Sequence, residues 1–251
     1  MLNGLWKLSW LETKIFVREP MGLIGSLLVP VVIFVIGGRV MGTNPAGAAA
    51  VADAAEGAPL NMAILASLII AVGAVLSLIS IISIYREGGI LKRLRATPLS
   101  PLTILGAHVV VKLLFTVAGM ALLVLAGRRF FPGAMQVNLL SFTAALLLST
   151  LSILSLGFVL ASIVPTARFA QPLGAAVLYP MLSVSGLFVP LEQLPTAVRL
   201  VAYGLPMTHA VALMQGIWDG SGWSAHWTNV AGLVLIFGVC SALATWVFRW
   251  E

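Results

Sequence analysis

Charged residues are scarce in this sequence. They make up 9% of its 251 residues, whereas about a quarter of an ordinary soluble domain is charged. Hydrophobic residues account for 60% of the chain, a composition typical of a membrane protein with several spans. The net charge of +6 at pH 7 comes from basic residues near the ends of apolar runs, where anionic lipid headgroups are a better partner than nucleic acid.

Cysteine is nearly absent as well. Cys240 is the only cysteine, so an intrachain disulfide is excluded and cysteine usage does not reveal the redox compartment. The start of the chain also lacks the basic, apolar and small-residue succession of a cleavable signal peptide. We expect the first membrane span to act as its own targeting signal.

A nucleotide-binding loop is missing too. Such a loop ends in Gly-Lys-Ser or Gly-Lys-Thr, because backbone amides and the lysine must both reach the phosphates. The lysines are Lys7, Lys14, Lys92 and Lys112, and none of them follows a glycine. ATP hydrolysis is therefore expected in a separate chain. We expect no catalytic residue, cofactor or metal site in this one.

The sequence contains instead several runs that could cross a membrane, for which a helix needs about 20 apolar residues. We predict one all-helical membrane domain over residues 1–251, with six spans at Met21–Gly38, Leu60–Ile84, Leu102–Gly127, Val137–Val164, Phe169–Leu191 and Val230–Val247. His108 and Lys112 lie one turn apart near the inner end of the third span. We expect both side chains to extend toward the membrane surface.

The positions of Lys and Arg predict the orientation of these spans, because short basic loops resist translocation. If the amino terminus is cytoplasmic, the inner segments contain most of the basic residues: Lys7, Lys14, Arg18, Arg86, Lys92, Arg93, Arg95, Arg168 and Arg249. The outer segments contain Arg39, Arg128, Arg129 and Arg199. We therefore predict that both termini are cytoplasmic and that the Ala- and Gly-rich stretch from Thr43 to Pro59 is an outer loop.

Two further segments are predicted to be helical without spanning. In residues 1–20 the polar side chains share a narrow arc at helical spacing, which is typical of a helix lying in the membrane interface: Asn3, Lys7, Lys14 and Arg18. In residues 190–228, Pro190, Pro195 and Pro206 divide apolar segments that are too short to cross. We expect re-entrant helices there, which enter the outer leaflet and turn back.

The loop after the second span, residues 86–101, is the most informative segment. Apolar residues at helical spacing form one edge of it and basic residues surround that edge: Ile90, Leu91 and Leu94, and Lys92, Arg93 and Arg95. Pro98 disfavours helix at the residue before it and so ends the pattern. The residues alone predict a short basic helix outside the membrane, which could simply lie on lipid headgroups.

This loop resembles the cytoplasmic loop of the ABC type-2 transporter permease family, which includes the membrane subunits of daunorubicin-type drug exporters. In that loop a glutamate and a glycine precede a basic helix ending in Thr-Pro-Leu-Ser, as in Glu87 to Ser100 here. Residues 185–195 and 205–210 resemble the family's outer element and the Asn-Pro-Leu-Thr segment after it, with Leu205 in place of the asparagine. Thr13 to Pro20 resembles the entry into the family's first span.

The resemblance implies the permease subunit of an ATP-binding-cassette exporter in a bacterial or archaeal plasma (inner) membrane. In such exporters two permease subunits form the pathway, and two cytoplasmic ATPases, which bind ATP and magnesium, drive transport. The second permease would be another copy of this chain or a similar partner. The substrate would be an amphipathic drug-like or lipid-like molecule, moved out of the cytoplasm or the inner leaflet.

The resemblance also implies two groups of functional residues. Those that would couple the permease to the ATPase are Glu87, Gly88, Ile90, Leu91, Arg93, Leu94 and Arg95. Those of the outer re-entrant element are Gly186, Pro190, Glu192, Pro195 and Pro206.

Other functions fit the residues less well. An intramembrane hydrolase would need a nucleophile beside a base, for which Ser185 with His209 is the best pair, yet the flanking sequence lacks the leading glycine of a Gly-x-Ser-Gly site. An ion-driven carrier or channel usually shows ionisable residues at midplane depth and inverted repeats, and neither is evident. The third alternative is a membrane scaffold without transport activity. Transport that depends on a partner ATPase would exclude it.

Small residues follow one face of two predicted spans. They are Gly73, Ser77 and Ser80 in the second span, and Ser149, Ser152 and Ser155 in the fourth. This spacing favours close helix packing over lining of a pathway. Pro30 and Pro180 are expected to bend the first and fifth spans, because each removes a backbone hydrogen bond.

Overall fold

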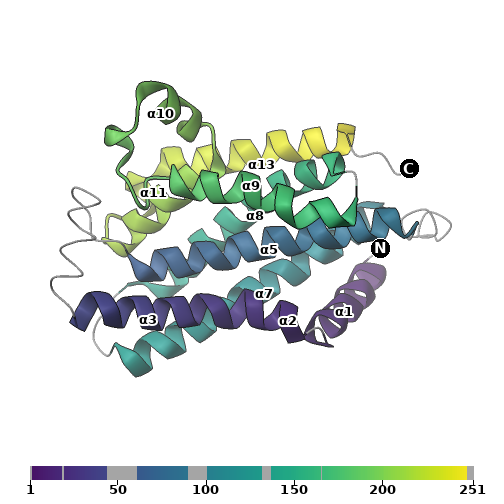
Figure 1. Cartoon of the computed structure of the whole chain (residues 1–251), viewed down its shortest axis with the longest axis horizontal. Coiled ribbons are helices and arrows are strands. Elements are labelled where there is room, and N and C mark those ends of the chain that lie inside the picture. Colours follow the sequence, from purple (N-terminus) through teal and green to yellow (C-terminus); the bar gives the residue numbers. More distant parts are fainter. Residues whose placement is uncertain are drawn as a thin grey trace.

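The computed structural model describes residues 2–18, 20–43, 61–89, 101–131, 137–164 and 166–247. Every regular element in these ranges is a helix, so the all-helical prediction is confirmed. The elements are α1 (Leu2–Arg18), α2 (Pro20–Leu23), η1 (Ile24–Leu28), α3 (Val29–Thr43), α5 (Met62–Glu87), α7 (Pro101–Phe130), α8 (Leu139–Ile163), α9 (Ala167–Ser183), η2 (Leu191–Gln193), α10 (Thr196–Tyr203), α11 (Pro206–Trp218), α12 (Gly222–Ala225) and α13 (Trp227–Val247). The long helices run side by side in one bundle (Figure 1).

Helices α5 and α8 form the centre of this bundle. Within their most apolar windows, 67% of α5 and 56% of α8 is buried, against 17% of α13. Helix α8 packs against α5, α11 and α13, and α5 packs against α3, α7 and α9. Fully buried side chains fill the space between them, among them Ile64, Leu68, Ile79, Phe142, Leu146 and Ile153. Helix α13 lies at the periphery, where its exposed apolar face suits contact with lipid.

Side-chain caps fix where the two central helices begin. Asn61 Oδ1 accepts hydrogen bonds from the backbone amides of Ala63 and Ile64, at 3.0 and 3.2 Å. Asn138 Oδ1 accepts from the amide of Ser141 at 3.2 Å. Each cap satisfies donors that have no partner inside the first helical turn.

Four helices in the described ranges are long and apolar enough to cross a membrane: Ala63–Glu87 of α5, Gly106–Phe130 of α7, Leu139–Ile163 of α8 and Trp227–Trp246 of α13. They correspond to the second, third, fourth and sixth predicted spans. Helices α10 and α11 are apolar enough as a pair but meet at a bend of 81°. The sharp elbow matches the division that prolines were expected to impose on residues 190–228.

The first and fifth predicted spans are less regular. The first is divided among α2, η1 and α3, of which Ile24–Val40 is an apolar helical stretch below spanning length. The fifth, α9, has 17 residues and contains Pro172 and Pro180. At 1.5 Å per residue it is about 25 Å long, shorter than a hydrocarbon core of about 30 Å.

The break in the first span is a π-helical turn. The amide of Val29 donates to the carbonyl of Ile24, five residues earlier. Pro30 follows at once and has no amide hydrogen, so the α-helical bond that would anchor this turn is absent. The distortion expected at Pro30 is thus a wide turn just before it.

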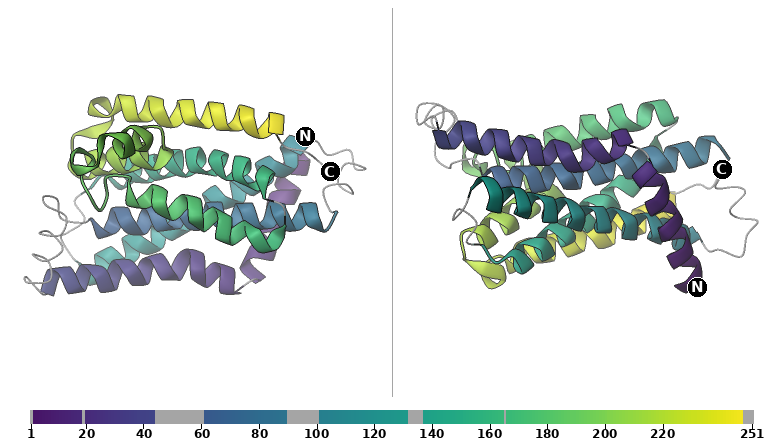
Figure 2. Two further views of the ribbon diagram at one scale, coloured as in Figure 1. Left: turned by 45° about the horizontal axis from the view of Figure 1, so that its top comes forward. Right: turned by 90° about the horizontal axis from the view of Figure 1, so that it is seen from below.

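The two ends of the bundle are distinct (Figure 1). At one end, called here the Gly89 end, α1 and α7 begin and α5 and α13 end. At the opposite end, called the Thr43 end, α3 ends and α5 begins, and α10 and α12 also lie there. Helix α1 crosses the bundle at an angle at the Gly89 end (Figure 2). Its tryptophans Trp6 and Trp10 are 70% and 66% exposed. The interfacial position of this helix stays a prediction.

Candidate functional site

A groove of about 400 Å³ lies between α2, η1 and α3 on one side and α5 and α9 on the other. Apolar side chains form most of its wall, and its polar groups are Ser26, Ser77, Ser80, Gln171 and Tyr179. No charged side chain is among the described residues that line it. Pockets that bind small molecules have volumes of about 300–1,000 Å³ and a similar mixture of apolar walls with a few polar groups.

The wide turn of η1 contributes one wall of the groove. Gly22, Gly25, Ser26 and Val29 from this segment face it. A methyl group at Gly73 of α5 would lie 3.9 Å from Ser26 Cα, so the two helices are in ordinary contact at that point. The groove opens beside this contact.

The two rows of small residues have different surroundings. Ser77 and Ser80 line the groove, and Ser80 Oγ donates to the carbonyl of Leu76 at 2.9 Å. Ser152 of the other row is fully buried and donates across the α8–α13 contact to the carbonyl of Leu233, at 2.9 Å. Close packing therefore accounts for the row in α8, whereas the row in α5 forms part of the groove wall.

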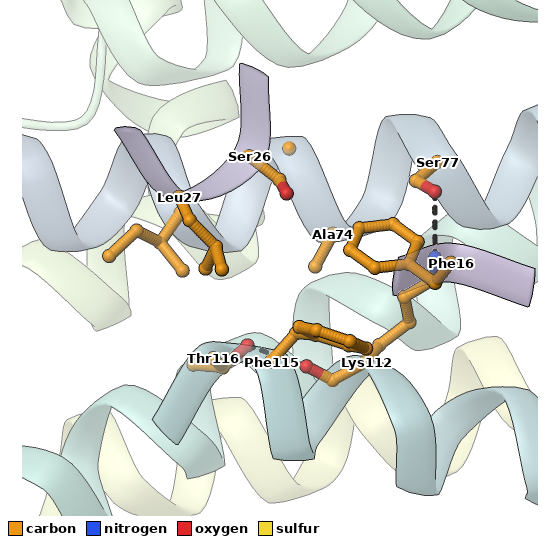
Figure 3. A pocket seen from close by; sticks show the side chains of 10 residues that line it. Phe16, Ser26, Leu27, Ala74, Ser77, Lys112, Phe115 and Thr116 are labelled. Carbon is orange, nitrogen blue, oxygen red and sulfur yellow. Dashed lines mark hydrogen bonds between the residues drawn. The ribbon is translucent and has the colours of Figure 1, made fainter. Parts of the chain in front are cut away.

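Lys112 is directed into the protein from α7. Its Nζ donates to Ser77 Oγ at 2.7 Å and lies 4.6 Å from the centre of the Phe16 ring (Figure 3). Lys112 is 6% exposed and His108 is 3% exposed, so the prediction that both side chains reach toward the membrane surface is wrong. The Ser77 hydroxyl and the face of the Phe16 ring contact the Lys112 ammonium in place of water at the membrane surface.

His108 belongs to a second polar contact, which joins α1 to the bundle. Glu12 of α1 accepts a hydrogen bond from the Tyr85 hydroxyl at 2.6 Å, and its other oxygen lies 3.6 Å from His108 Nδ1. Next to it, the rings of Phe16 and Phe115 are 4.2 Å apart. Sequence reasoning missed Glu12; the signal was a single carboxylate on an otherwise basic amphipathic helix.

The end of α5 is fastened to the junction between α8 and α9. Arg86 Nη1 donates to the carbonyl of Ser162 in the last turn of α8 at 3.1 Å. Glu87 Oε2 accepts from the amide of Ala167, the first residue of α9, at 2.7 Å. Thr166 precedes α9 without a side-chain cap of its own, so Glu87 provides the missing acceptor.

The charges of Arg86 and Glu87 match the two helix ends that they contact. A cation stabilises the negative C-terminal end of a helix dipole, and an anion stabilises the positive N-terminal end. We call this contact of Arg86 with α8 and of Glu87 with α9 the double cap. It holds the start of the predicted coupling loop against the helix that forms one wall of the groove.

Only part of the predicted coupling group can be placed. Glu87 belongs to the double cap, and Gly88 ends α5 with its amide donating to the carbonyl of Ile84 at 2.8 Å. The remaining members, Ile90, Leu91, Arg93, Leu94 and Arg95, lie outside the described residues.

The predicted outer residues all lie at the Thr43 end, between α9 and α11. Gly186 has a φ of +89°, which few residues other than glycine adopt, and a methyl group there would lie 3.2 Å from Leu191 Cγ. Pro190 and Pro195 precede η2 and α10, and Pro206 is the first residue of α11. Glu192 lies in η2 and is exposed.

The residues of the hydrolase alternative are not paired with each other. Ser185 Oγ is buried and donates to the carbonyl of Leu182 at 2.6 Å. The ring nitrogens of His209 contact Asn229 Oδ1 and the carbonyl of Tyr203, at 3.1 and 3.0 Å. The best nucleophile and base in the sequence are thus engaged separately.

Residues 3–218 match the family described as ABC-2 type transporter. Two curated relatives, each named inner membrane transport permease YhhJ, come from Escherichia coli (strain K12) and Shigella flexneri. Each is 27% identical to this chain over 167 residues, which are 65% of this chain and 44% of the relative. The chain thus matches less than half the length of these relatives.

Proposed function

The chain belongs to the ABC-2 type transporter family, and from this premise we propose that it is the permease subunit of an exporter driven by a separate cytoplasmic ATPase. The observation that carries the proposal is the geometry of α5. One helix forms a wall of the groove with Ser77 and Ser80, and then ends in the double cap at the start of the basic loop. A displacement of the loop would therefore reach the groove through a single rigid element.

The substrate class follows from the groove wall. An apolar wall with five polar groups and no charged side chain among the described lining residues suits an uncharged or weakly polar amphipathic molecule. A highly charged solute would lose its hydration there without gaining a partner. We propose a drug-like or lipid-like substrate, taken from the cytoplasm or the inner leaflet.

The basic loop supplies the proposed contact with the ATPase. Residues 86–101 would seat a short helix in a cleft of that subunit, with Leu94 on its apolar edge and Arg93 and Arg95 toward an acidic rim. ATP and magnesium would be bound by the ATPase, with two ATPases and two permeases in each complex. A second copy of this chain is the simplest partner.

The Gly89 end is proposed to face the cytoplasm of a bacterial or archaeal cell. Both termini would then lie on the cytoplasmic side of the plasma (inner) membrane. The segment from α2 to α3 and the short α9 would complete six spans with the four long helices. The elbow between α10 and α11 would be the re-entrant element in the outer leaflet, because its 81° bend prevents a single straight crossing.

A substitution that fills the groove tests the proposal. In proteoliposomes that contain the permease and its ATPase, Nile red, an uncharged amphipathic dye, should stimulate ATP hydrolysis. Ser80→Trp should raise the dye concentration needed for stimulation by about tenfold or more, because the indole occupies the binding space. Leu235→Trp on the exposed face of α13 is the matched control and should leave stimulation unchanged. Equal stimulation in both variants, or stimulation only by a polyprenyl-linked sugar, would contradict this substrate site.

A further inference from the structure

A small cavity lies beside the groove, on the side of α7. Its volume is about 10 Å³, which is room for one water molecule or one oxygen atom of a ligand. The cavity and the groove have four lining residues in common, which we call the shared wall: Phe16, Ser26, Gly73 and Ser77. Lys112 lines the small cavity but not the groove. The groove therefore has a basic side chain directly behind part of its wall.

The Lys112 ammonium contacts the shared wall at Ser77. Its Nζ donates a hydrogen bond to Ser77 Oγ at 2.7 Å (Figure 3). A hydroxyl that accepts one hydrogen bond still has its own hydrogen to donate. An oxygen atom of a ligand that approaches the shared wall from the groove can accept that hydrogen, and it then lies one hydrogen bond away from the ammonium. Two donors from different helices, α5 and α7, thus converge on one position.

This position is inside the bundle and away from its ends. Ser77 is ten residues before the last residue of α5, which is about 15 Å along the helix axis. Lys112 is buried, and its Nζ lies 4.6 Å from the centre of the Phe16 ring of α1. Opposite charges attract more strongly in such surroundings than in water. Ionisable side chains inside membrane-spanning segments commonly mark the path of a substrate or an ion.

The carboxylate of Glu12, which lies near this position on α1, is engaged with other groups. It accepts a hydrogen bond from the Tyr85 hydroxyl at 2.6 Å, and its second oxygen lies 3.6 Å from His108 Nδ1. No acidic side chain is among the described residues that line the groove or the small cavity. A negative charge at the shared wall would therefore come from a ligand.

We propose that Lys112 is a specificity-determining residue that binds one anionic oxygen group of an amphipathic substrate, a carboxylate or a phosphodiester. The apolar part of the molecule occupies the groove, and the anionic group lies at the shared wall, where Ser77 donates a hydrogen bond and Lys112 supplies the opposite charge. A second charged group would have no such partner among the described residues of the groove, so the site selects a single charge. The inference rests on the proposed function for the role of the ligand as a substrate.

Two ligands that differ in charge test the proposal: dansylaminoundecanoate and its primary amide. The permease and its ATPase are placed in phosphatidylcholine nanodiscs without ATP, and dansyl fluorescence gives the affinity for each ligand after subtraction of the signal from protein-free discs. At about pH 8 the acid is ionised. The unmodified protein should bind the acid about tenfold more tightly than the amide. Lys112→Met keeps an unbranched apolar side chain against Phe16 and should bind both ligands equally.

The control is Lys7→Gln, which removes one positive charge from an exposed position of α1. It should keep the preference for the acid, because general attraction of anions to a basic protein is not the cause. Lys112→Gln replaces Lys112→Met if the latter does not fold. Equal affinities in the unmodified protein would overturn the proposal. A preference that persists in a folded neutral variant of Lys112, or one that disappears in Lys7→Gln, would overturn it as well.

Stimulation of ATP hydrolysis by Nile red is measured in the same nanodiscs, because this uncharged dye does not need Lys112. Lys112→Met should leave the stimulating concentration of Nile red unchanged. Absence of stimulation in the unmodified protein would contradict the proposed function, while the binding preference between acid and amide would still decide the role of Lys112. The two failures are thus distinguishable.

Discussion

Glu12 is the only acidic residue of α1, and it accepts a hydrogen bond from Tyr85 while facing His108. Its side chain is 13% exposed, so removal of the carboxylate leaves the half-buried Tyr85 hydroxyl and the buried His108 ring without this partner. Such unsatisfied groups cost about 1–3 kcal/mol. The contact therefore fastens α1 to the bundle, next to the hydrogen-bonded pair of Lys112 and Ser77 beside the groove.

Glu12→Leu should lower the thermal unfolding midpoint and loosen α1. Ser9, 5% exposed on the docked face, reports this directly. In a Cys240→Ala background, Ser9→Cys should react slowly with a maleimide, and several times faster when Glu12→Leu is added. Glu12→Gln keeps an acceptor for the Tyr85 hydroxyl and should give an intermediate rate. Equal labelling rates in all three proteins would show that this carboxylate does not hold α1.

Individual side chains were harder to predict from the sequence than their helices. Lys112 lies one turn after His108 near the end of an apolar run, a position from which lysine usually extends to the surface. Ser77, its hydrogen-bond partner, and Phe16, its aromatic neighbour, come from two other helices. Helical periodicity describes the faces of one helix and does not indicate which faces meet.

At the scale of elements, strongly apolar helices were predictable and interrupted ones were not. Helices α5, α7, α8 and α13 coincide with predicted spans because each contains a long uncharged stretch. The first predicted span is interrupted by the wide turn before Pro30, and α9 contains two prolines and ends at Ser183. Sequence showed the prolines but could not show whether each would kink, widen or end its helix.

The double cap makes an element-scale prediction, since it depends on which charge meets which helix end. The exchange Arg86→Glu with Glu87→Arg keeps both charges but places each at the unfavourable end of α8 or α9. We expect transport per ATP hydrolysed to fall severalfold, with little change in stability, because Glu87 is exposed and screened by solvent. Arg86→Lys with Glu87→Asp is the conservative control and should retain most of the coupling. Equal coupling ratios in the exchanged and conservative proteins would show that charge placement is irrelevant.

At the scale of the whole molecule, the Gly89 end and the Thr43 end are connected by α5 and α9. The groove lies along these helices, the double cap holds them together at the Gly89 end, and the elbow between α10 and α11 follows α9 at the Thr43 end. The resemblance in the basic loop and the family match over residues 3–218 support the proposed transport role, which the groove alone would not suggest. A groove wall is shared by helices distant in sequence, so its shape was not predictable from any one of them.

A separate ATPase is proposed to drive transport through its contact with residues 86–101, and this proposal concerns the assembled transporter. On the proposed apolar edge, Leu94→Glu would bring a carboxylate into an apolar cleft at a cost of about 2–4 kcal/mol. Leu94→Met keeps an apolar side chain of similar size and is the matched control. On a lipid surface, the same glutamate could turn toward water at little cost.

The decisive measurement is ATP-dependent export of Nile red by proteoliposomes that contain the ATPase with unmodified, Leu94→Met or Leu94→Glu permease at equal expression. Co-purification of the ATPase is measured in parallel. We predict that Leu94→Met exports normally, and that Leu94→Glu loses most of its export together with coupled hydrolysis or ATPase binding. Normal export and normal ATPase binding in Leu94→Glu would contradict the proposed coupling loop.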